Sequence, residues 1–270
     1  MDVADDSNPI KFFEQFIQSK EALALATFFS GKDTGKKCLI DQNGKCIAGE
    51  VNDQVKEDLM AIFYSKKSHA KEYFLKEDSA EIFLELVQPT IHLLIFGGGF
   101  DARPVSKLAQ SLGWNVQVTD ECVAHLAPVF FPDTKLSLCQ REFVDRDFEI
   151  TPFTACVLMS HNYEYDRDVL KKLLPSSTPY VGILGPRKRF DKMMDEFSTT
   201  GLNLSSDDLL RIHSPIGLDI GAEAPDEIAV SIIAEIQAVF YERKGGFLKS
   251  LNGPIHKREA TTDQVLKRIF

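Results

Sequence analysis

The sequence predicts an α/β protein with a parallel sheet in its C-terminal part. From residue 91 onward, short apolar runs alternate with segments of helical periodicity, which is typical of parallel strands joined by crossover helices. A glycine-rich turn directly follows the first of these runs, whereas hairpin signals dominate before residue 90. We therefore expect a smaller α/β domain over 1–89, a Rossmann-like domain over 90–245 and a peripheral tail over 246–270.

The smaller domain is predicted to contain two helices and several short strands. Asn43 and Gly44 lie between two apolar stretches and indicate a tight hairpin, and Pro89 ends the last strand. The predicted helices cover 9–22 and 53–67, the predicted strands cover 36–40, 45–51, 71–75 and 80–89, and residues 22–30 form a strand or a helix end.

The Rossmann-like domain contains four clear strands and four helices. Its last helix has the strongest signals, because Pro225 stands in the first turn, an apolar face follows, and Gly245 comes after the end. The predicted strands are 91–96, 115–120, 153–160 and 179–185, and the predicted helices are 103–112, 166–174, 187–199 and 225–243.

Composition restricts the classes of partner. The chain of 270 residues has 31 Lys and Arg against 40 Asp and Glu, and its net charge of −9 argues against nucleic acid or an anionic membrane as partner. No stretch approaches the roughly 20 apolar residues of a membrane span, and no secretion signal is recognisable. Five cysteines without a CxxC pair indicate neither a disulfide framework nor a zinc site. We expect a cytoplasmic protein without a metal site.

A phosphate-binding signature follows the first strand of the Rossmann-like domain. Gly97, Gly99 and Ala102 fit the pattern G-x-G-x-x-G/A, in which the glycines permit a tight turn and the close approach of a pyrophosphate. Asp120 ends the next strand, near the position from which a carboxylate meets a ribose hydroxyl. The alternative is that the glycines serve only the geometry of the turn.

Two further strand ends carry polar side chains. His161 should emerge at the carboxyl edge of the sheet, where open α/β sheets bind ligands, either as a titrating group or as a residue that ties the loop to the next helix. Arg187, Lys188 and Arg189 follow the next strand, where they could clamp a phosphate or carboxylate. Cations at a helix N-terminus oppose the helix dipole, which hints at an anionic ligand, although a solvated helix start would also account for them.

The stretch RIHSPIGLDIGAEAPDEIAVSIIAEI, residues 211–236, is the most informative. A loop that contains His213, Asp219, Gly217 and Gly221 runs straight into the last predicted helix. Its glycines and prolines specify the backbone tightly at the place where a helix N-terminus is exposed. Such a loop is more often functional than incidental, so we treat His213 and Asp219 as candidate functional residues.

Together these segments resemble the XdhC/CoxI family of accessory proteins for molybdenum hydroxylases such as xanthine dehydrogenase. The similarity is carried by GGGFDA at 97–102, MSHNYEYD at 159–166, YVGILGPRKR at 180–189 and, above all, the stretch 211–236. The resemblance implies a chaperone, more than a catalyst, that binds molybdenum cofactor and assists its sulfuration or insertion into a xanthine dehydrogenase-type molybdoenzyme. It also implies a cysteine desulfurase as a second partner and a homodimeric assembly.

The resemblance also assigns residues to roles. Its cofactor-binding positions are Gly97, Gly98, Gly99, Asp120, Gly185, Arg187, Lys188, Gly217 and Gly221, and its catalytic or ligand-orienting positions are His161, His213 and Asp219. Two departures are notable. Phe100 stands where the family usually has a histidine, and the segment AGEVND at 48–53 lacks the family's cysteine. Cys38 and Cys46 lie nearby on the predicted hairpin, as thiol ligands or as small core residues.

Two other functions fit the same residues. An NAD(P)-dependent oxidoreductase would use the glycine signature and Asp120, with His161 or His213 as proton donor. A nucleotide-binding regulatory protein would bind the nucleotide without the chemistry, and a regulatory or scaffold protein could retain the fold and lose the ligand. Affinity for NAD(P) separates the oxidoreductase from an accessory protein, and removal of Asp120 or His213 without any functional effect would indicate the protein that has lost its ligand.

Overall fold

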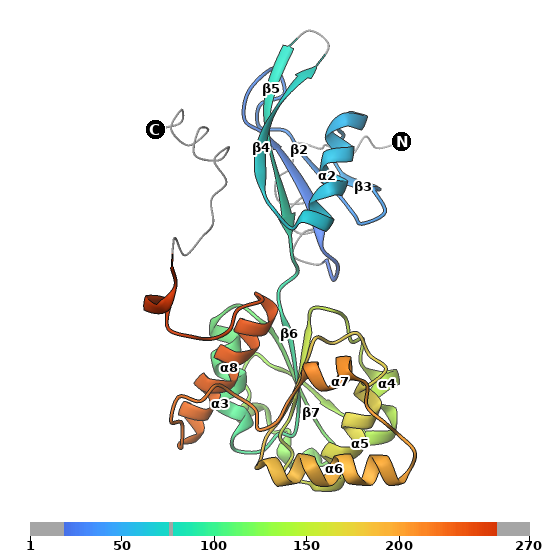
Figure 1. Cartoon of the computed structure of the whole chain (residues 1–270), viewed down its shortest axis with the longest axis vertical. Helices are drawn as coiled ribbons and strands as arrows, with labels where there is room; N and C mark the ends of the chain where they lie inside the picture. The colour runs from blue at the N-terminus through green and yellow to red at the C-terminus, as the bar shows by residue number, and fades with distance from the viewer. Residues whose placement is uncertain (1–18, 76–77, 253–270) are drawn as a thin grey trace. The chain divides into compact units, whose positions relative to one another are not determined.

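The computed structural model describes residues 19–75 and 78–252, and the chain divides into two compact units (Figure 1). The N-terminal unit comprises the described residues before Thr90, with which the residues from Leu248 onward are grouped, and the Rossmann unit is Thr90–Phe247. The helix predicted over 9–22 falls outside the described residues except for its last four, which are not helical. Most of the predicted tail, from 253 onward, also lies outside them.

The N-terminal unit is a five-stranded antiparallel sheet with a helix packed on one face. Alternation along β1 points Ala24, Ala26 and Phe28 into a core that includes Val55, Leu59 and Ile62 of the helix. Asn52 caps that helix by accepting a hydrogen bond from the Val55 N–H. The strand order is β3-β2-β1-β5-β4, with β1 Leu23–Phe28, β2 Lys37–Ile40, β3 Cys46–Ala48, β4 His69–Leu75 and β5 Asp78–Val87, and the helix is α2 Asp53–Ser65.

The Rossmann unit contains a six-stranded parallel sheet, as the alternation of strands and helices predicts. The strand order is β11-β10-β9-β6-β7-β8, with β6 His92–Phe96, β7 Asn115–Asp120, β8 Lys135–Leu138, β9 Thr154–Leu158, β10 Tyr180–Ile183 and β11 Ile212–His213. The helices are α3 Ala102–Ser111, α4 Val144–Asp147, α5 Tyr163–Leu173, α6 Arg187–Thr199, α7 Ser206–Arg211 and α8 Pro225–Phe240. Short 3₁₀ helices are η1 Val123–His125, η2 Pro128–Phe130, η3 Arg141–Phe143 and η4 Leu248–Ser250.

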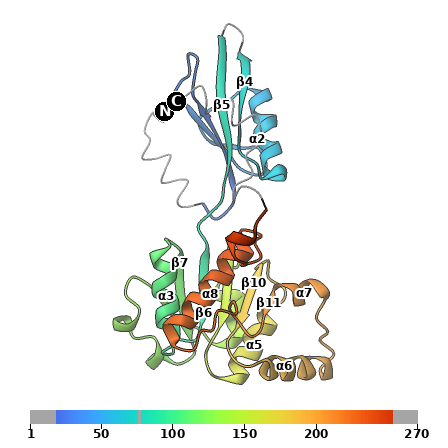
Figure 2. The ribbon, with the colours of Figure 1, turned by 60° about the vertical axis from the view of Figure 1, so that its left-hand side comes forward.

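Helices cover both faces of this sheet (Figure 2). Leu93 and Ile95 of β6 point into the core formed with α3 and α8, whereas Leu94 and Phe96 point into the core formed with α4, α5 and α6. Both faces of β6 are therefore buried from Leu93 to Phe96, which accounts for the apolar run over these four residues. In the described part of the chain no helix has the length and apolar composition needed to cross a membrane.

The sheet has a topological switch point between β6 and β9. These strands are neighbours, yet the chain leaves β6 toward β7 and β8 on one side and leaves β9 toward β10 and β11 on the other. In open α/β sheets, ligands bind at the carboxyl edge beside such a switch point. Gly97 follows β6 and His161 follows β9, so both lie at this edge.

The structure also corrects element boundaries. β8, β11 and α7 were not predicted, because each has six residues or fewer and no marked periodicity. The helix predicted over 225–243 ends at Phe240. Glu242 adopts a positive φ of 53°, and the Arg243 N–H donates to the Ala238 carbonyl, which closes the helix before Gly245.

Candidate functional site

The glycine turn after β6 is pressed between two neighbouring loops. Gly97 has φ +119°, and a Cβ there would lie 2.5 Å from the backbone of Ser160. A Cβ on Gly98 would lie 2.6 Å from the carbonyl oxygen of His125. Gly99 has more room, because a Cβ would lie 3.6 Å from the ring of His161. The first two glycines are thus required by the packing of the protein itself, and Gly99 is the least crowded of the three.

Asp120, at the end of β7, braces this turn. Its Oδ2 accepts a hydrogen bond from the Gly98 N–H at 2.9 Å and lies 2.9 Å from Nδ1 of His125, and its Oδ1 accepts from the Cys122 N–H at 2.8 Å. The residue is 4% exposed. The sugar contact predicted for Asp120 therefore competes with three contacts inside the protein.

His161 links the two sides of the switch point. It has a positive φ of 59°, and its Nε2 lies 3.1 Å from Oδ2 of Asp101, which precedes α3. The next residue, Asn162, caps α5 by accepting hydrogen bonds from the N–H groups of Glu164 and Tyr165. His161 is exposed, and its contact joins the loop after β9 to the start of α3, while Asn162 makes the tie to the next helix.

Asp166 and Arg189 form a buried ion pair behind the same edge. Arg189 Nη2 donates to Asp166 Oδ2 at 2.6 Å, and the Ser160 hydroxyl donates to Asp166 Oδ1 at 2.6 Å. Burial raises the pKa of Asp166 despite these hydrogen bonds. Arg189 lies in the same basic run as Arg187 and Lys188, but it differs from them because its side chain is directed inward and pairs with Asp166.

Arg187 and Lys188 are exposed in the first turn of α6. Arg187 donates through Nη1 to the Ser214 carbonyl at 3.1 Å and lies 3.2 Å from Asp191. The N-cap, Pro186, makes no side-chain hydrogen bond to the helix. Gly185, with φ +125°, stands directly before this N-terminus. The first turn of α6 is therefore a cationic surface beside the loop that follows β11.

His213 is packed against α8. Its Nδ1 lies 3.2 Å from Oε1 of Glu235, and its ring stacks on Tyr180 with the centroids 4.5 Å apart. Glu235 Oε2 accepts from the Tyr180 hydroxyl at 2.6 Å and from the Gly217 N–H at 2.9 Å. Burial raises the pKa of Glu235, but the hydrogen bonds from His213, Tyr180 and Gly217 outweigh it and lower the pKa overall. His213 and Gly217 are thus tied to one carboxylate.

The predicted site residues fall into two groups. Gly97, Gly98, Gly99, Asp120 and His161 surround the switch point, whereas Gly185, Arg187, Lys188, His213, Gly217, Asp219 and Gly221 belong to β10, β11 and the loops that follow them. Three strand spacings separate β6 from β11, which is about 14 Å at ~4.8 Å per strand. Asp219 is exposed, and a Cβ on Gly221 would meet no atom within 4 Å. One small group of atoms cannot contact both sets, but an elongated ligand could.

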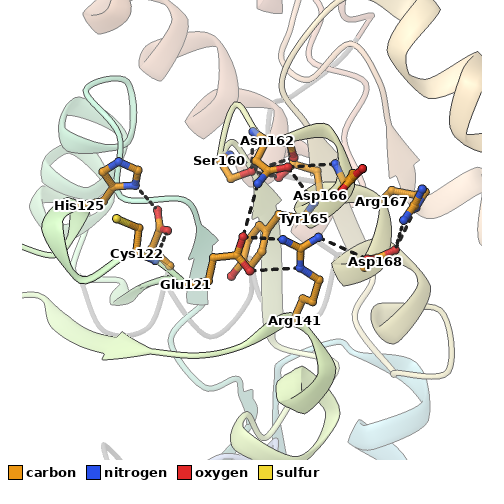
Figure 3. Close-up of polar contacts among 12 residues, drawn as sticks. Glu121, Cys122, His125, Arg141, Ser160, Asn162, Tyr165, Asp166, Arg167 and Asp168 are labelled. Atoms are coloured by element: carbon orange, nitrogen blue, oxygen red, sulfur yellow. Dashed lines mark hydrogen bonds and ion pairs between the residues drawn. The ribbon is translucent and has the colours of Figure 1, made fainter.

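Sequence reasoning missed several residues of this edge. Arg141 of η3 makes a two-pronged contact with Glu121, at 2.5 and 3.1 Å, and lies 3.4 Å from Asp168 of α5 (Figure 3). The Tyr165 hydroxyl is buried beneath them and has no hydrogen bond partner. Acidic and basic residues far apart in sequence carry no local signal of pairing, so only the fold reveals this cluster.

The thiols are divided between interior and surface. Cys139 and Cys156 are buried in the Rossmann unit, and burial raises the pKa of each to about 12, so both are protonated at neutral pH. Cys122 is exposed after β7. In the N-terminal unit Cys38 is a core residue and Cys46 is exposed. Within residues 19–75 and 78–252, no group of three or more His, Cys, Asp or Glu is placed to hold a metal ion.

Fold and site define a protein with a Rossmann-like domain whose carboxyl edge carries a braced glycine turn and a cationic helix start. The chain belongs to the XdhC Rossmann domain family, whose pattern residues 93–236 match. A crystal structure of a xanthine dehydrogenase from Bacillus halodurans has a similar fold, with a TM-score of 0.53 and 18% identity over 87% of this chain and 96% of that chain.

Two relatives have informative names. A probable xanthine dehydrogenase subunit of Bacillus subtilis is 32% identical over 161 residues, which cover 59% of this chain and 46% of that protein. The molybdenum cofactor insertion chaperone PaoD of Escherichia coli is 22% identical over 152 residues, which cover 56% of this chain and 41% of that protein. This chain thus spans less than half the length of each relative.

Proposed function

We propose that the chain is an accessory protein that binds molybdenum cofactor as cargo and assists its sulfuration or insertion into a xanthine dehydrogenase-type molybdoenzyme. Its family and the names of two relatives support this assignment. The single observation that carries it is the arrangement of the polar side chains around the glycine turn. The polar side chains closest to the turn contact one another, Asp120 with His125 and His161 with Asp101, which favours a site that holds a ligand over one that transforms it.

The glycine turn is the feature that would meet the phosphate end of such a cargo. Gly99 is the least crowded of its three glycines, whereas the first N–H groups of α3 are engaged, because those of Ala102 and Arg103 donate to the Gly99 and Phe100 carbonyls and Pro104 has none. Arg187 and Lys188 would contact a second anionic group, which fits the two separate groups of site residues. His161, His213 and Asp219 would orient the ligand or the client enzyme.

The molybdenum end of the cargo calls for a soft ligand, for which a thiolate is suited. Cys122 is the exposed thiol of the Rossmann unit, and it follows Glu121 at the carboxyl edge of the sheet. We therefore take Cys122 as the candidate for contact with the cargo in the Rossmann unit, whereas Cys38 is buried in the core of the N-terminal unit. Sulfuration would need a sulfur donor, and a cysteine desulfurase is the partner that we propose for that step. We also propose that the chain acts as a homodimer, which size-exclusion chromatography with light scattering tests.

The G-x-G-x-x-A turn specifically favours a second candidate, an NAD(P)-dependent oxidoreductase or a nucleotide-binding regulator. The internal contacts of Asp120 weaken it, because the carboxylate that would bind the ribose already accepts hydrogen bonds from the turn.

The deciding experiment is native mass spectrometry with metal analysis on the full chain, after incubation with molybdenum cofactor and, separately, with NAD(P). Retention of pterin and molybdenum is the expected result, and Arg187→Glu should weaken it while leaving the fold intact. Retention of NAD(P) alone would transfer the assignment to the second candidate, and retention of neither would contradict both.

A further inference from the structure

Arg103 is unusual among the arginines of the Rossmann unit. Most of the others form ion pairs with carboxylates; these are Arg141, Arg146, Arg167, Arg187, Arg189 and Arg211. Arg103 makes no ion pair with any residue that the structure describes, and its Nε is buried without a hydrogen bond partner. The chain has more acidic than basic residues, so carboxylates are abundant. An arginine without a carboxylate partner can therefore bind another anion.

Two aromatic rings hold the Arg103 side chain. The guanidinium carbon lies 3.5 Å from the ring centroid of Phe130, in η2, and 5.3 Å from that of Phe100, in the turn before α3. Phe100 is 65% exposed and Phe130 is 42% exposed, so the cluster lies at the surface. Stacking covers the face of a guanidinium but leaves its donors free, because all five N–H groups lie in its plane. The geometry thus fixes the plane, and although Nε is buried, neither Nη group donates a hydrogen bond to a residue that the structure describes.

The position of Arg103 supplies the context. It is the second residue of α3 and is separated from Gly99 by three residues, at the side of the switch point toward β7. Neither of the nearest polar groups of the turn competes for it, since Asp101 contacts His161 and Asp120 contacts Gly98 and His125. The N–H groups of Ala102 and Arg103 donate to the Gly99 and Phe100 carbonyls and Pro104 has none, so the guanidinium of Arg103 is the donor that the helix start offers to a phosphate oxygen.

We propose that Arg103, clamped by Phe130 and Phe100, binds a phosphate or pyrophosphate group of the molecule held at the glycine turn. This inference rests on the proposed function only for the identity of that molecule. It also gives Phe100 a role at the position where the family usually has a histidine: the ring orients a cation instead of contacting the ligand through a nitrogen.

The test is calorimetric titration of the full chain with inorganic pyrophosphate, with inorganic phosphate for comparison. Arg103→Gln should weaken pyrophosphate binding roughly ten-fold or more, because charge-assisted hydrogen bonds are lost. Arg103→Lys should also weaken it, because lysine keeps the charge but not the planar fork. Arg243→Gln is the matched control: Arg243 is exposed beyond α8, without an ion pair in the described chain, and its removal changes net charge equally.

A second measurement keeps the test valid if a variant unfolds. In the unmodified protein labelled with ¹⁵N, the Arg103 Nε–H signal should shift on addition of pyrophosphate, and the Arg243 signal should stay in place. Equal affinity of Arg103→Gln and unmodified protein, equal losses in Arg103→Gln and Arg243→Gln, or an unmoved Arg103 signal would each overturn the inference. Pyrophosphate binding through Arg103 without retention of molybdenum cofactor would uphold this site and contradict the proposed function, so the two failures are distinguishable.

Discussion

The carboxylate of Asp120 accepts a hydrogen bond from the backbone N–H of Gly98 at 2.9 Å, and this contact joins the end of β7 to the turn after β6. The two residues are adjacent in space because β6 and β7 are parallel neighbours in register, with Phe96 opposite Thr119. A carboxylate in the position typical of a sugar contact is here part of the scaffold that shapes the phosphate-binding turn. Asp120 and the glycine turn therefore act as one unit.

Loss of this brace should destabilise the Rossmann unit. Asp120→Ala leaves the Gly98 N–H without its acceptor, and we expect a loss of about 3 kcal/mol in the free energy of unfolding, within the range for buried hydrogen bonds to charged groups. Urea denaturation followed by circular dichroism measures the change. Asp219→Ala is the control, because Asp219 is exposed and its removal should change stability by less than about 0.5 kcal/mol. Equal denaturation midpoints for the two variants would contradict the structural role of Asp120.

Glu235 should make stability depend on pH in the acid range. Its pKa is lowered from its ordinary value of about 4.5, so the folded state favours the ionised form. The resulting stability is fully present above that value and is lost as pH falls through the lower pKa of the folded state. We expect Glu235→Gln to be less stable at pH 7 and to show a flatter decline between about pH 5 and pH 3. The control is Glu223→Gln, an exposed carboxyl of the loop before α8, which should retain the full decline.

Loss of the hydroxyl group should change the free energy of unfolding in opposite directions at two buried tyrosines, Tyr165 and Tyr180. Tyr165→Phe removes a buried hydroxyl that has no partner, so stability should rise by up to about 1 kcal/mol. Tyr180→Phe removes the donor that contacts Glu235 at 2.6 Å, so stability should fall by about 1–3 kcal/mol. Both values come from urea denaturation at pH 7. A clear loss in Tyr165→Phe would show that this hydroxyl has a partner in solution.

The fold could be predicted from the sequence because its signals are local. Unbroken apolar runs such as Leu94–Phe96 mark strands buried on both faces, and the glycine turn marks the place where β6 meets α3. The resemblance of the stretch 211–236 to the XdhC/CoxI family supplied the remaining evidence for the fold. Elements without such signals, the two-residue β11 above all, depend on the neighbours against which they pair.

The contacts of the site could not be predicted in the same way. Arg187 and Arg189 are two residues apart in one basic run, yet one is exposed and the other pairs with Asp166 in the interior. That difference follows from the helical rotation between them and from the place of α5, neither of which a charge pattern contains. Arg103 was missed for the same reason, because Phe130, the ring on which it stacks, is distant in sequence. Arg103 is important because it forms no ion pair with a described carboxylate, and a charge pattern does not contain that information.

Close packing at Gly97 provides the most direct test of the switch-point geometry. A methyl group there would lie 2.5 Å from the backbone of Ser160, and the residue would keep a φ of +119° that alanine rarely adopts. The turn and the loop after β9 would have to separate, so Gly97→Ala should cost about 3 kcal/mol or more of stability and weaken pyrophosphate binding. Gly221→Ala is the matched control: its φ of +74° is also positive, but no atom lies within 4 Å of its Cβ. It should cost only about 1 kcal/mol, from backbone strain alone. Similar losses of stability in the two variants, measured by thermal and urea unfolding, would mean that the contact with Ser160 does not limit the turn.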